Sequence, residues 1–378
     1  MRILFDLFFA QPIGSSKFHG GGEYMKAVFK RLVELNSKDD IIVFYDFDKF
    51  IDDWIIELIR QNHIKSVDVK SIKEVEEIFQ DEKIDTFYSG MPYKYYEISM
   101  PKVVRKIGTF HGLRFAEKPS DKYAPYYYKG KEKWKFLLKY IFEDYFQKKA
   151  TNYYRNGIDA FDDIVTVSKH TEYAIRTLCN GKSNKTINVF YTPAKFISDE
   201  KNDVAEVTGR YILLMGGNRW EKNACRALLA IENLFDKGWL EDYKIVVIGK
   251  LPEKMIKKLI HKERYLLLGY VETEKLENLY KYCDVFLYPS LNEGFGMPPL
   301  EAMKYGKTCI VSAVCSLPEV CGNGVYYVNP YDIREIENRI LHAIDEKIPS
   351  RQVYESFEKT YNKQTEDLDL LCRFIIER

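Results

Sequence analysis

The sequence predicts an α/β protein built from two open sheets of largely parallel strands. Short apolar runs rich in β-branched and aromatic residues alternate with amphipathic helical patterns from one end of the chain to the other. This alternation is typical of βα units, which form parallel sheets covered by helices. The chain has 378 residues, more than one hydrophobic core usually serves, so we expect two domains. Because neither half repeats the other at a short fixed period, a solenoid is excluded.

The apolar runs are short and bounded by polar residues, which is typical of strands. In the first half they cover 2–9, 41–45, 65–69, 84–88, 104–110 and 164–167. In the second half they cover 211–215, 244–248, 265–268, 284–288, 308–312 and 325–328. The amphipathic segments between them predict helices, for example over 22–36, 223–237, 273–281, 298–305 and 332–346.

A polar stretch without apolar periodicity, 197–209, predicts the domain boundary. We therefore expect an amino-terminal domain over 1–205 and a carboxy-terminal domain over 206–352. Each is large enough for its own open α/β sheet, and ligands of such sheets bind at the carboxyl ends of the strands. The last segment, 353–376, carries aromatic residues and leucines on one helical stripe, and we expect it to pack back on the first domain.

The composition is that of an ordinary globular protein, with 46% hydrophobic and 30% charged residues. A formal net charge of +1 gives no general attraction to nucleic acid. The apolar run at the amino terminus is broken by Asp6 and is too short for a signal peptide, and no apolar segment is long enough to span a membrane. The seven cysteines include no C-x-x-C pair, which argues against a disulfide framework or a zinc site. We therefore expect a cytoplasmic protein.

The most informative stretch is SLNEGFGMPPLEAMKYG, residues 290–306, which follows a predicted buried strand and opens into a helix. Pro298 and Pro299 suit the first helical turn, where a missing N–H costs nothing, and Gly306 suits the end of the helix. The small residues Gly294 and Gly296 let backbone amides approach a ligand closely. The helix start favours an anionic group such as a diphosphate.

Two glutamates flank that helix start. Glu293 lies in the loop and Glu301 is expected in the first helical turn. At this spacing their carboxylates can reach opposite ends of one small ligand. Carboxylates accept hydrogen bonds from hydroxyl groups, which a ribose and a sugar ring both offer.

The stretch EGFGMPPLEAM, placed between a strand and a helix, resembles the E-x7-E motif of the retaining glycosyltransferases of family 4. These enzymes have the GT-B architecture, two Rossmann-like α/β/α domains facing a central cleft. The resemblance implies that Glu301 binds the ribose of the nucleotide and that Glu293 contacts hydroxyl groups of the donor sugar. It also implies that the backbone of Gly294, Phe295 and Gly296 lies beside that sugar. A well-capped helix without a ligand is the alternative that the residues alone leave open.

A second stretch, YILLMGGNRWEKNACRALLAI at 211–231, is similar to the first strand of the family's second domain and the basic pair that follows it. Here the pair is Arg219 and Lys222. The resemblance implies that it neutralises the donor diphosphate and the charge that develops on the leaving group, which makes it catalytic. Two exposed basic residues near a helix start are the alternative. We expect Asn223 to cap the helix that follows.

Two more segments of the second half follow the family in the same order. LLLGYVETEKLENLYKYCDVFLYPS, 266–290, is similar to the segment that cups the nucleotide base, near Val271. SLPEVCGNGVYYVNPYD, 316–332, is similar to the family's next loop.

In the first half, KFHGGGEYMKAVFKRL places three glycines before an amphipathic helix. The third glycine of a dinucleotide fingerprint is absent, so that function is not predicted. In family 4 enzymes a glycine loop here lies over the donor phosphates, which implies that role for Gly20, Gly21 and Gly22. His111, in TFHGLRF after a strand, resembles the histidine that family members place by the donor sugar. A structural histidine is the alternative.

The resemblance covers nearly the whole chain and is strongest over 211–332. It implies a hexosyltransferase of polysaccharide or lipopolysaccharide biosynthesis, which transfers mannose, glucose or a similar sugar from GDP or UDP to a glycan or lipid-linked glycan, with retention. We expect cationic side chains and the helix start to meet the diphosphate charge, and therefore no metal and no cofactor beside the donor. Two other functions stay open: another GT-B enzyme, such as a disaccharide phosphorylase or sugar-nucleotide epimerase, and a non-catalytic sugar-binding protein.

Residues 122–155 combine many aromatic residues with nine Lys or Arg and three acidic residues. Such a mixture can lie at a membrane surface, with rings in the interface and ammonium groups at anionic head groups. This would place the protein at the inner face of the membrane, next to a lipid-linked acceptor. The alternative is a solvated helix pair whose aromatic residues fill a core.

Overall fold

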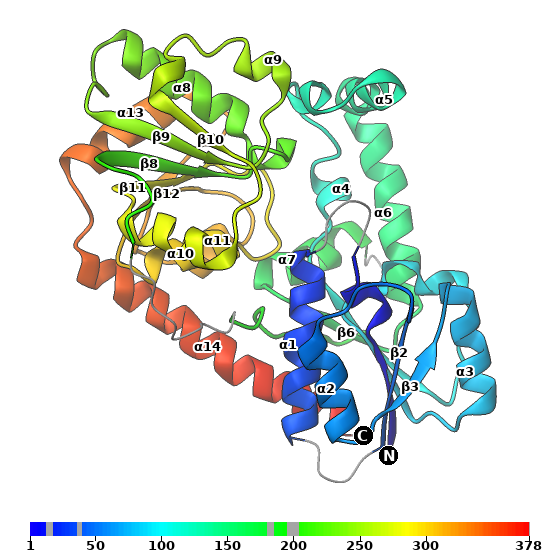
Figure 1. Cartoon of the computed structure of the whole chain (residues 1–378). Coiled ribbons are helices and arrows are strands. Elements are labelled where there is room, and N and C mark those ends of the chain that lie inside the picture. The colour runs from blue at the N-terminus through cyan, green and yellow to red at the C-terminus, as the bar shows by residue number, and fades with distance from the viewer. Residues whose placement is uncertain (13–17, 36–39, 180–184, 195–203, 378) are drawn as a thin grey trace. The chain divides into compact units, whose positions relative to one another are not determined.

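The computed structural model describes residues 1–12, 18–35, 40–179, 185–194 and 204–377. These form two compact units (Figure 1). The first contains Met1–Leu113, Thr151–Phe196 and Asn362–Arg378, and the second contains Arg114–Ala150 and Ile197–Tyr361. Of the polar stretch predicted as the boundary, residues 197–203 lie outside the described residues. Segment 114–150 belongs to the second unit because its tyrosines pack against the core of the second sheet.

The sheet of the first unit has seven described strands, all parallel, in the order β3-β2-β1-β4-β5-β6-β7. They are β1 (Arg2–Asp6), β2 (Asp40–Tyr45), β3 (Lys65–Asp68), β4 (Thr86–Ser89), β5 (Arg105–Phe110), β6 (Asp163–Thr166) and β7 (Ile187–Val189). The helices between them are α1 (Gly20–Leu35), α2 (Asp53–Gln61), α3 (Val75–Asp81), α7 (Lys169–Ala174) and the second part of α6 (Glu143–Asp159). The sequence did not predict β7, because three residues are too few for a periodic pattern.

The sheet of the second unit has six described strands, also parallel, in the order β10-β9-β8-β11-β12-β13. They are β8 (Arg210–Met215), β9 (Tyr243–Ile248), β10 (Tyr265–Leu268), β11 (Val285–Tyr288), β12 (Thr308–Ser312) and β13 (Tyr326–Val328). The helices are α4 (Arg114–Glu117), α5 (Gly130–Ile141), α8 (Ala224–Asp236), α9 (Glu253–Ile256), α10 (Thr273–Tyr282), α11 (Met297–Met303), α12 (Leu317–Cys321) and α13 (Ile333–Asp345). The predicted α/β class with two parallel sheets is confirmed.

Strand order decides where each unit can bind a ligand. In the second sheet the order reverses between β8 and β11, which are neighbours although β9 and β10 separate them in sequence. Loops leaving the carboxyl ends of two such strands diverge and open a crevice, the usual ligand site of an open α/β sheet. The first sheet has the same reversal between β1 and β4. The segments with Arg219, Lys222, Glu293 and Glu301 follow β8 and β11 in the second unit.

The central strands of the second sheet, β8, β9, β11 and β12, are buried on both faces. Ile212, Leu213 and Leu214 in β8 are all fully buried. Consecutive buried residues in a parallel strand mean that helices cover both faces, which explains the continuous apolar runs in the sequence.

The last helix, α14 (Ser350–Ile376), contributes to both units. In the first unit, Asp369 accepts a hydrogen bond from Arg31 Nε at 2.6 Å. In the second, Thr360 Oγ1 donates to the carbonyl of Val320 at 2.7 Å. Among the described residues, no helix combines the length and apolar character that a membrane span requires.

Candidate active site

The loop after β8 begins with glycines that allow a close packing no other residue would permit. Gly216 has a φ of +92°, and a Cβ there would lie 2.4 Å from Cγ of Lys222. A Cβ on Gly217 would lie 2.5 Å from the carbonyl oxygen of Gly249, in the loop after β9. The aliphatic part of Lys222 therefore folds directly over the loop backbone, at the carboxyl end of β8.

The centre of the candidate site is a buried cluster around the Glu293 carboxylate. Its Oε1 accepts hydrogen bonds from Lys222 Nζ at 2.5 Å, Ser290 Oγ at 2.6 Å and Tyr288 Oη at 2.7 Å. Lys222 Nζ also lies 2.5 Å from Tyr288 Oη. Tyr288 ends β11 and Ser290 and Glu293 follow it, so the topological reversal brings Lys222 and Glu293 together from distant parts of the sequence.

The two charged groups of this cluster determine each other's protonation. Burial by itself would raise the pKa of Glu293, but the adjacent Lys222 ammonium and the hydroxyl donors lower it below its ordinary value. Burial lowers the pKa of Lys222, and Glu293 opposes that effect. The carboxylate is therefore ionised, and it supports the charged form of Lys222 in a nearly water-free place.

Arg219 adds positive charge on the same loop. Its Nε donates to Glu221 Oε1 at 2.7 Å, and Arg114 Nη1 pairs with the same oxygen. The Glu221 side chain is only 5% exposed, whereas that of Arg219 is 49% exposed. Although burial opposes it, the two guanidinium groups hold the pKa of Glu221 below its ordinary value. One face of Arg219 is thus fixed and the other is open to solvent.

The loop after β11 is held in shape by Gly296 and Ser316. Gly296 has a φ of +109°, and a Cβ there would lie 2.5 Å from Leu317 Cδ2. Ser316 Oγ lies 2.9 Å from the carbonyl oxygen of Glu293 and 2.8 Å from that of Phe295. Its single hydroxyl proton is shared between these two acceptors. The loop can therefore keep Glu293 and the backbone of Gly294 in one orientation.

Glu301 is in the second turn of α11, because the helix begins at Met297. The prediction that it lies in the first turn was wrong by one turn, since the two prolines occupy the first turn as expected. Oε2 of Glu301 accepts a hydrogen bond from Tyr280 Oη at 2.9 Å. This half-buried carboxylate is oriented by a fully buried tyrosine of α10.

Asn223 occupies the N-cap position of α8, but the prediction that it caps the helix was wrong. Its φ is +61°, and its side chain makes no capping hydrogen bond. The amide nitrogen instead donates to the carbonyls of Pro289 at 3.0 Å and Pro330 at 2.7 Å, and Oδ1 accepts from Arg226 at 2.9 Å. Asn223 therefore joins the loops after β8, β11 and β13.

Val271 lies away from this centre. It follows β10, the edge strand, which β9 separates from β8. The amide of Gly249 donates to the carbonyls of Leu268 at 2.9 Å and Gly269 at 3.2 Å, which ties the loop before Val271 to the loop after β9. Val271 thus lies on the same carboxyl side of the sheet as Lys222 and Glu293. It follows the outermost strand, however, whereas they follow the two central strands.

A family model described as glycosyl transferases group 1 matches residues 197–360. That range contains β8, β11 and the Lys222–Glu293 cluster. Residues 197–360 are a glycosyl transferases group 1 domain. The side chains predicted from the family motif, Arg219, Lys222, Glu293 and Glu301, all lie in this group 1 domain.

The chain is also similar to curated proteins. Over 194 residues the chain is 31% identical to the O-antigen chain mannosyltransferase RfbU of Salmonella typhimurium, which covers 49% of this chain and 51% of that protein. Over 135 residues it is 29% identical to the serotype-specific mannosyltransferase WbdA of Escherichia coli, covering 34% of this chain and 17% of the relative. The chain thus spans about half or less of the length of these two proteins.

The whole chain shares its fold with the crystal structure of Anabaena Alr3699/HepE in complex with UDP and glucose. The TM-score is 0.69 at 14% identity, and the comparison covers 100% of this chain and 99% of the other. The likeness shows the fold, which is GT-B as the sequence motif implied.

In the first unit, the predicted glycines form the start of α1, and the side chain of His19 caps this helix. His19 Nδ1 accepts from the Gly22 amide at 3.0 Å, so its Nε2 carries the proton and donates to the carbonyl of Gln11 at 3.1 Å. A Cβ on Gly22 would lie 2.9 Å from the Ala10 carbonyl, and one on Gly21 would lie 2.5 Å from Met91 Sδ. Gly20 has open space around it.

His111 follows β5 at the carboxyl edge of the first sheet. Its Nε2 lies 2.8 Å from the Gly90 carbonyl, and its amide donates to Tyr93 Oη at 2.9 Å. Burial lowers the pKa of His111 to about 4, so the ring is neutral at pH 7. With the proton on Nε2, Nδ1 is the acceptor nitrogen. The carbonyl contact accounts for a structural role and does not test the predicted one.

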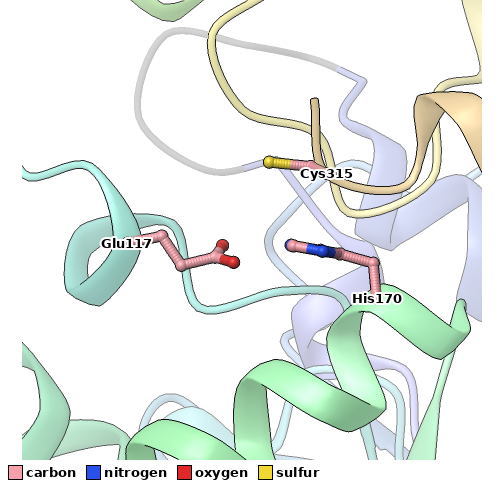
Figure 2. A group of neighbouring side chains, drawn as sticks. All are labelled: Glu117, His170 and Cys315. Atoms are coloured by element: carbon pink, nitrogen blue, oxygen red, sulfur yellow. The ribbon is translucent and has the colours of Figure 1, made fainter. Parts of the chain in front are cut away.

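The sequence did not reveal the residues that support the group 1 domain's loops. Asn292 Nδ2 donates to Glu117 Oε2 at 2.9 Å and lies 3.3 Å from Cys315 Sγ. Figure 2 shows Glu117 on α4 and Cys315 in the loop before α12. It also shows His170, a residue of the first unit. The sequence signal that could have indicated Asn292 is its place directly before Glu293 in the motif.

Proposed function

We propose that this chain is a retaining hexosyltransferase that moves mannose from a nucleotide-activated donor to a glycan chain, free or lipid-linked. The group 1 domain supports transfer from a nucleotide sugar. The names of RfbU and WbdA support mannose as the sugar, and that of RfbU supports a glycan chain as the acceptor. The proposed donor to be tested first is GDP-mannose.

The observation that carries the proposal is the pair of cations at the topological switch point, Lys222 held by Glu293 and Arg219 held by Glu221. Transfer breaks the bond between the sugar and the diphosphate, so negative charge develops on the leaving oxygen. Cations already in place stabilise that charge without reorganising, and a dry site strengthens the effect. Lys222 and Arg219 would meet this charge, and we therefore expect no need for a metal.

Glu293 and Glu301 would position the two ends of the donor. Once the diphosphate attracts Lys222, Oε2 of Glu293 can accept a hydrogen bond from a sugar hydroxyl. Glu301, oriented by Tyr280, would accept hydrogen bonds from the ribose. Because Glu293 is engaged by Lys222, Tyr288 and Ser290, we assign it to positioning rather than to covalent attack. The roles beside the donor that the family resemblance implies for Gly20, Gly21, Gly22 and His111 stay predictions.

A donor panel tests the proposal. The full chain is incubated with GDP-mannose, UDP-glucose, UDP-galactose and UDP-N-acetylglucosamine, with and without mannan oligosaccharide, while nucleotide release and glycan elongation are followed. We expect elongation and GDP release with GDP-mannose, and α-linked mannose in the product. Lys222→Met should remove the activity, whereas Lys257→Met, an exposed lysine of the same unit, should not.

Two results would replace the proposal. Release of sugar phosphate that depends on inorganic phosphate would indicate a phosphorylase. Donor binding without turnover on any acceptor, including lipid-linked glycans, would indicate a binding protein.

A further inference from the structure

The aromatic and basic stretch 122–155 divides into a buried part and an exposed part. Tyr123, Tyr126 and Tyr127 pack against the core of the second sheet. Phe136 is 7% exposed and stacks on Tyr128, with ring centroids 3.9 Å apart. These aromatic residues are accounted for by packing, so they cannot serve at a surface.

Several other large apolar side chains of the second unit's part of this stretch are exposed. On α5, Trp134 is 63% exposed, Leu138 46% and Ile141 59%. Their spacing of i, i+4 and i+7 places them on one face of the helix. The buried Phe136 is on the opposite face. Phe142 and Tyr145 continue the apolar surface into the start of α6, at 55% and 62% exposure. Trp134, Leu138, Ile141, Phe142 and Tyr145 are called the α5–α6 patch below.

Lysines accompany the patch along both helices. Residues 129–149 contain seven lysines against three acidic residues. Lys131 precedes Trp134 by three positions, and Lys148 and Lys149 follow Tyr145 by three and four, so each shares a helix face with a member of the patch. All three lysines are exposed. Two of the acids are already engaged, Glu132 with Lys135 at 3.1 Å and Glu143 with Lys118 at 3.2 Å.

An exposed apolar stripe without cationic neighbours would suit a second copy of the chain or a protein partner. Here the lysines would repel a second copy of the same patch. An anionic bilayer satisfies both features, since rings and aliphatic side chains enter the interfacial layer while ammonium groups meet phosphate head groups. Charge complementarity therefore selects the lipid surface as the occupant.

We propose that the α5–α6 patch and its flanking lysines dock the second unit on an anionic lipid bilayer. Docking occurs through Trp134, Leu138, Ile141, Phe142 and Tyr145, with Lys131, Lys148 and Lys149 at the head groups. The docking surface is thus one side of α5 and the first turns of α6, not the whole of residues 122–155. It does not depend on the transferase reaction, so its failure would leave the proposed function untouched.

Vesicle sedimentation of the full chain tests the patch directly. Vesicles of phosphatidylcholine with phosphatidylglycerol are compared with vesicles of phosphatidylcholine alone, at low and high salt. We expect binding to the anionic vesicles that weakens at high salt. Trp134→Ser should weaken it about tenfold or more, because an apolar side chain of this size is no longer buried. Lys148→Glu with Lys149→Glu should weaken it about 25-fold or more, at about fivefold for each lysine.

The second unit offers matched controls. Trp239 is 61% exposed, as Trp134 is, and Trp239→Ser should leave binding unchanged. Lys257→Glu with Lys262→Glu reverses two exposed lysines elsewhere in the unit and should have a smaller effect than the Lys148 and Lys149 pair. Circular dichroism melting verifies that each variant folds.

Three outcomes would overturn the proposal. In the first, the wild-type chain stays in the supernatant with anionic vesicles at low salt. In the second, Trp134→Ser and Trp239→Ser behave alike. In the third, the chain self-associates without vesicles, Trp134→Ser abolishes this, and no lipid binding is seen, which would assign the patch to a second copy.

Discussion

The ammonium group of Lys222 lies 2.5 Å from Oε1 of Glu293, and each side chain is only 11% exposed. The two residues are 71 positions apart and come together because β8 and β11 are neighbours at the reversal of strand order. A buried ion pair is expensive to form, and breaking it leaves one charge in a place with little water. The charged form of each residue therefore depends on the other in the folded chain.

Lys222→Met should lower kcat/KM at least about 100-fold, because one preorganised group that stabilises a developing negative charge contributes about that much. The measurement is steady-state nucleotide release with GDP-mannose, and the Lys257→Met variant is the control. A loss below about threefold would show that Lys222 does not meet the leaving group.

The same pair makes a stability prediction. Lys222→Met leaves the Glu293 carboxylate buried without its cation, which should cost about 3–5 kcal/mol of unfolding free energy, whereas a double change to Lys222→Met with Glu293→Leu should recover much of that loss. Urea unfolding of the donor-free chain distinguishes the two. Equal destabilisation by both variants would mean that the pair is not coupled.

Glu301→Ala should weaken donor binding about 10- to 150-fold, since a hydrogen bond to a charged group contributes about 1.5–3 kcal/mol. Calorimetric titration with the nucleotide donor measures this. Tyr280→Phe removes the hydroxyl that orients Glu301 and should give a smaller loss. If Glu301→Ala binds the donor as the wild type does, Glu301 is not a ribose residue.

Excess EDTA should leave most of the activity in place, because Lys222 and Arg219 already supply positive charge at the switch point. The assay is donor turnover before and after chelation, with magnesium and manganese added back. A complete loss that either metal restores would contradict metal-independent transfer.

Asp6 and His111 of the first unit should have opposite effects on stability over one range of pH. Burial raises the pKa of Asp6 to about 6, so the folded state binds more protons than the unfolded state above pH 3.8, and stability falls as the pH rises toward 6. Burial lowers the pKa of His111 to about 4, so the unfolded state binds more protons below pH 6.5, and stability rises as the pH rises from 4 to 6.5. The wild type should show a flattened profile.

Removing either group should reveal the effect of the other on the pH dependence of stability. Asp6→Asn should make the melting temperature increase from pH 4 to 6.5, and His111→Asn should make it decrease from pH 4 to 6. Melting curves read by circular dichroism test both variants against the wild type. Parallel profiles in all three proteins would show that neither group titrates as stated.

Much of the fold followed from local patterns. The runs YILLM and DVFLY predicted β8 and β11 because strands covered on both faces need continuous apolar residues, and this property is local. Pro298 and Pro299 predicted the start of α11 because the missing N–H groups suit a first turn. Three residues of β7 carried too little pattern to be recognised. The motif EGFGMPPLEAM indicated the site since it combines a loop, a helix start and two carboxylates in one segment.

Contacts between distant segments could not be read in this way. No local feature distinguishes the buried Phe136 from the exposed Trp134, because both are aromatic residues on the same helix and only packing against Tyr128 and Trp220 separates them. Asn223 suited a helix cap by its type, yet carbonyls from the loops after β11 and β13 attract its amide instead. Which polar group pairs with which depends on strand order, and strand order is a property of the whole sheet.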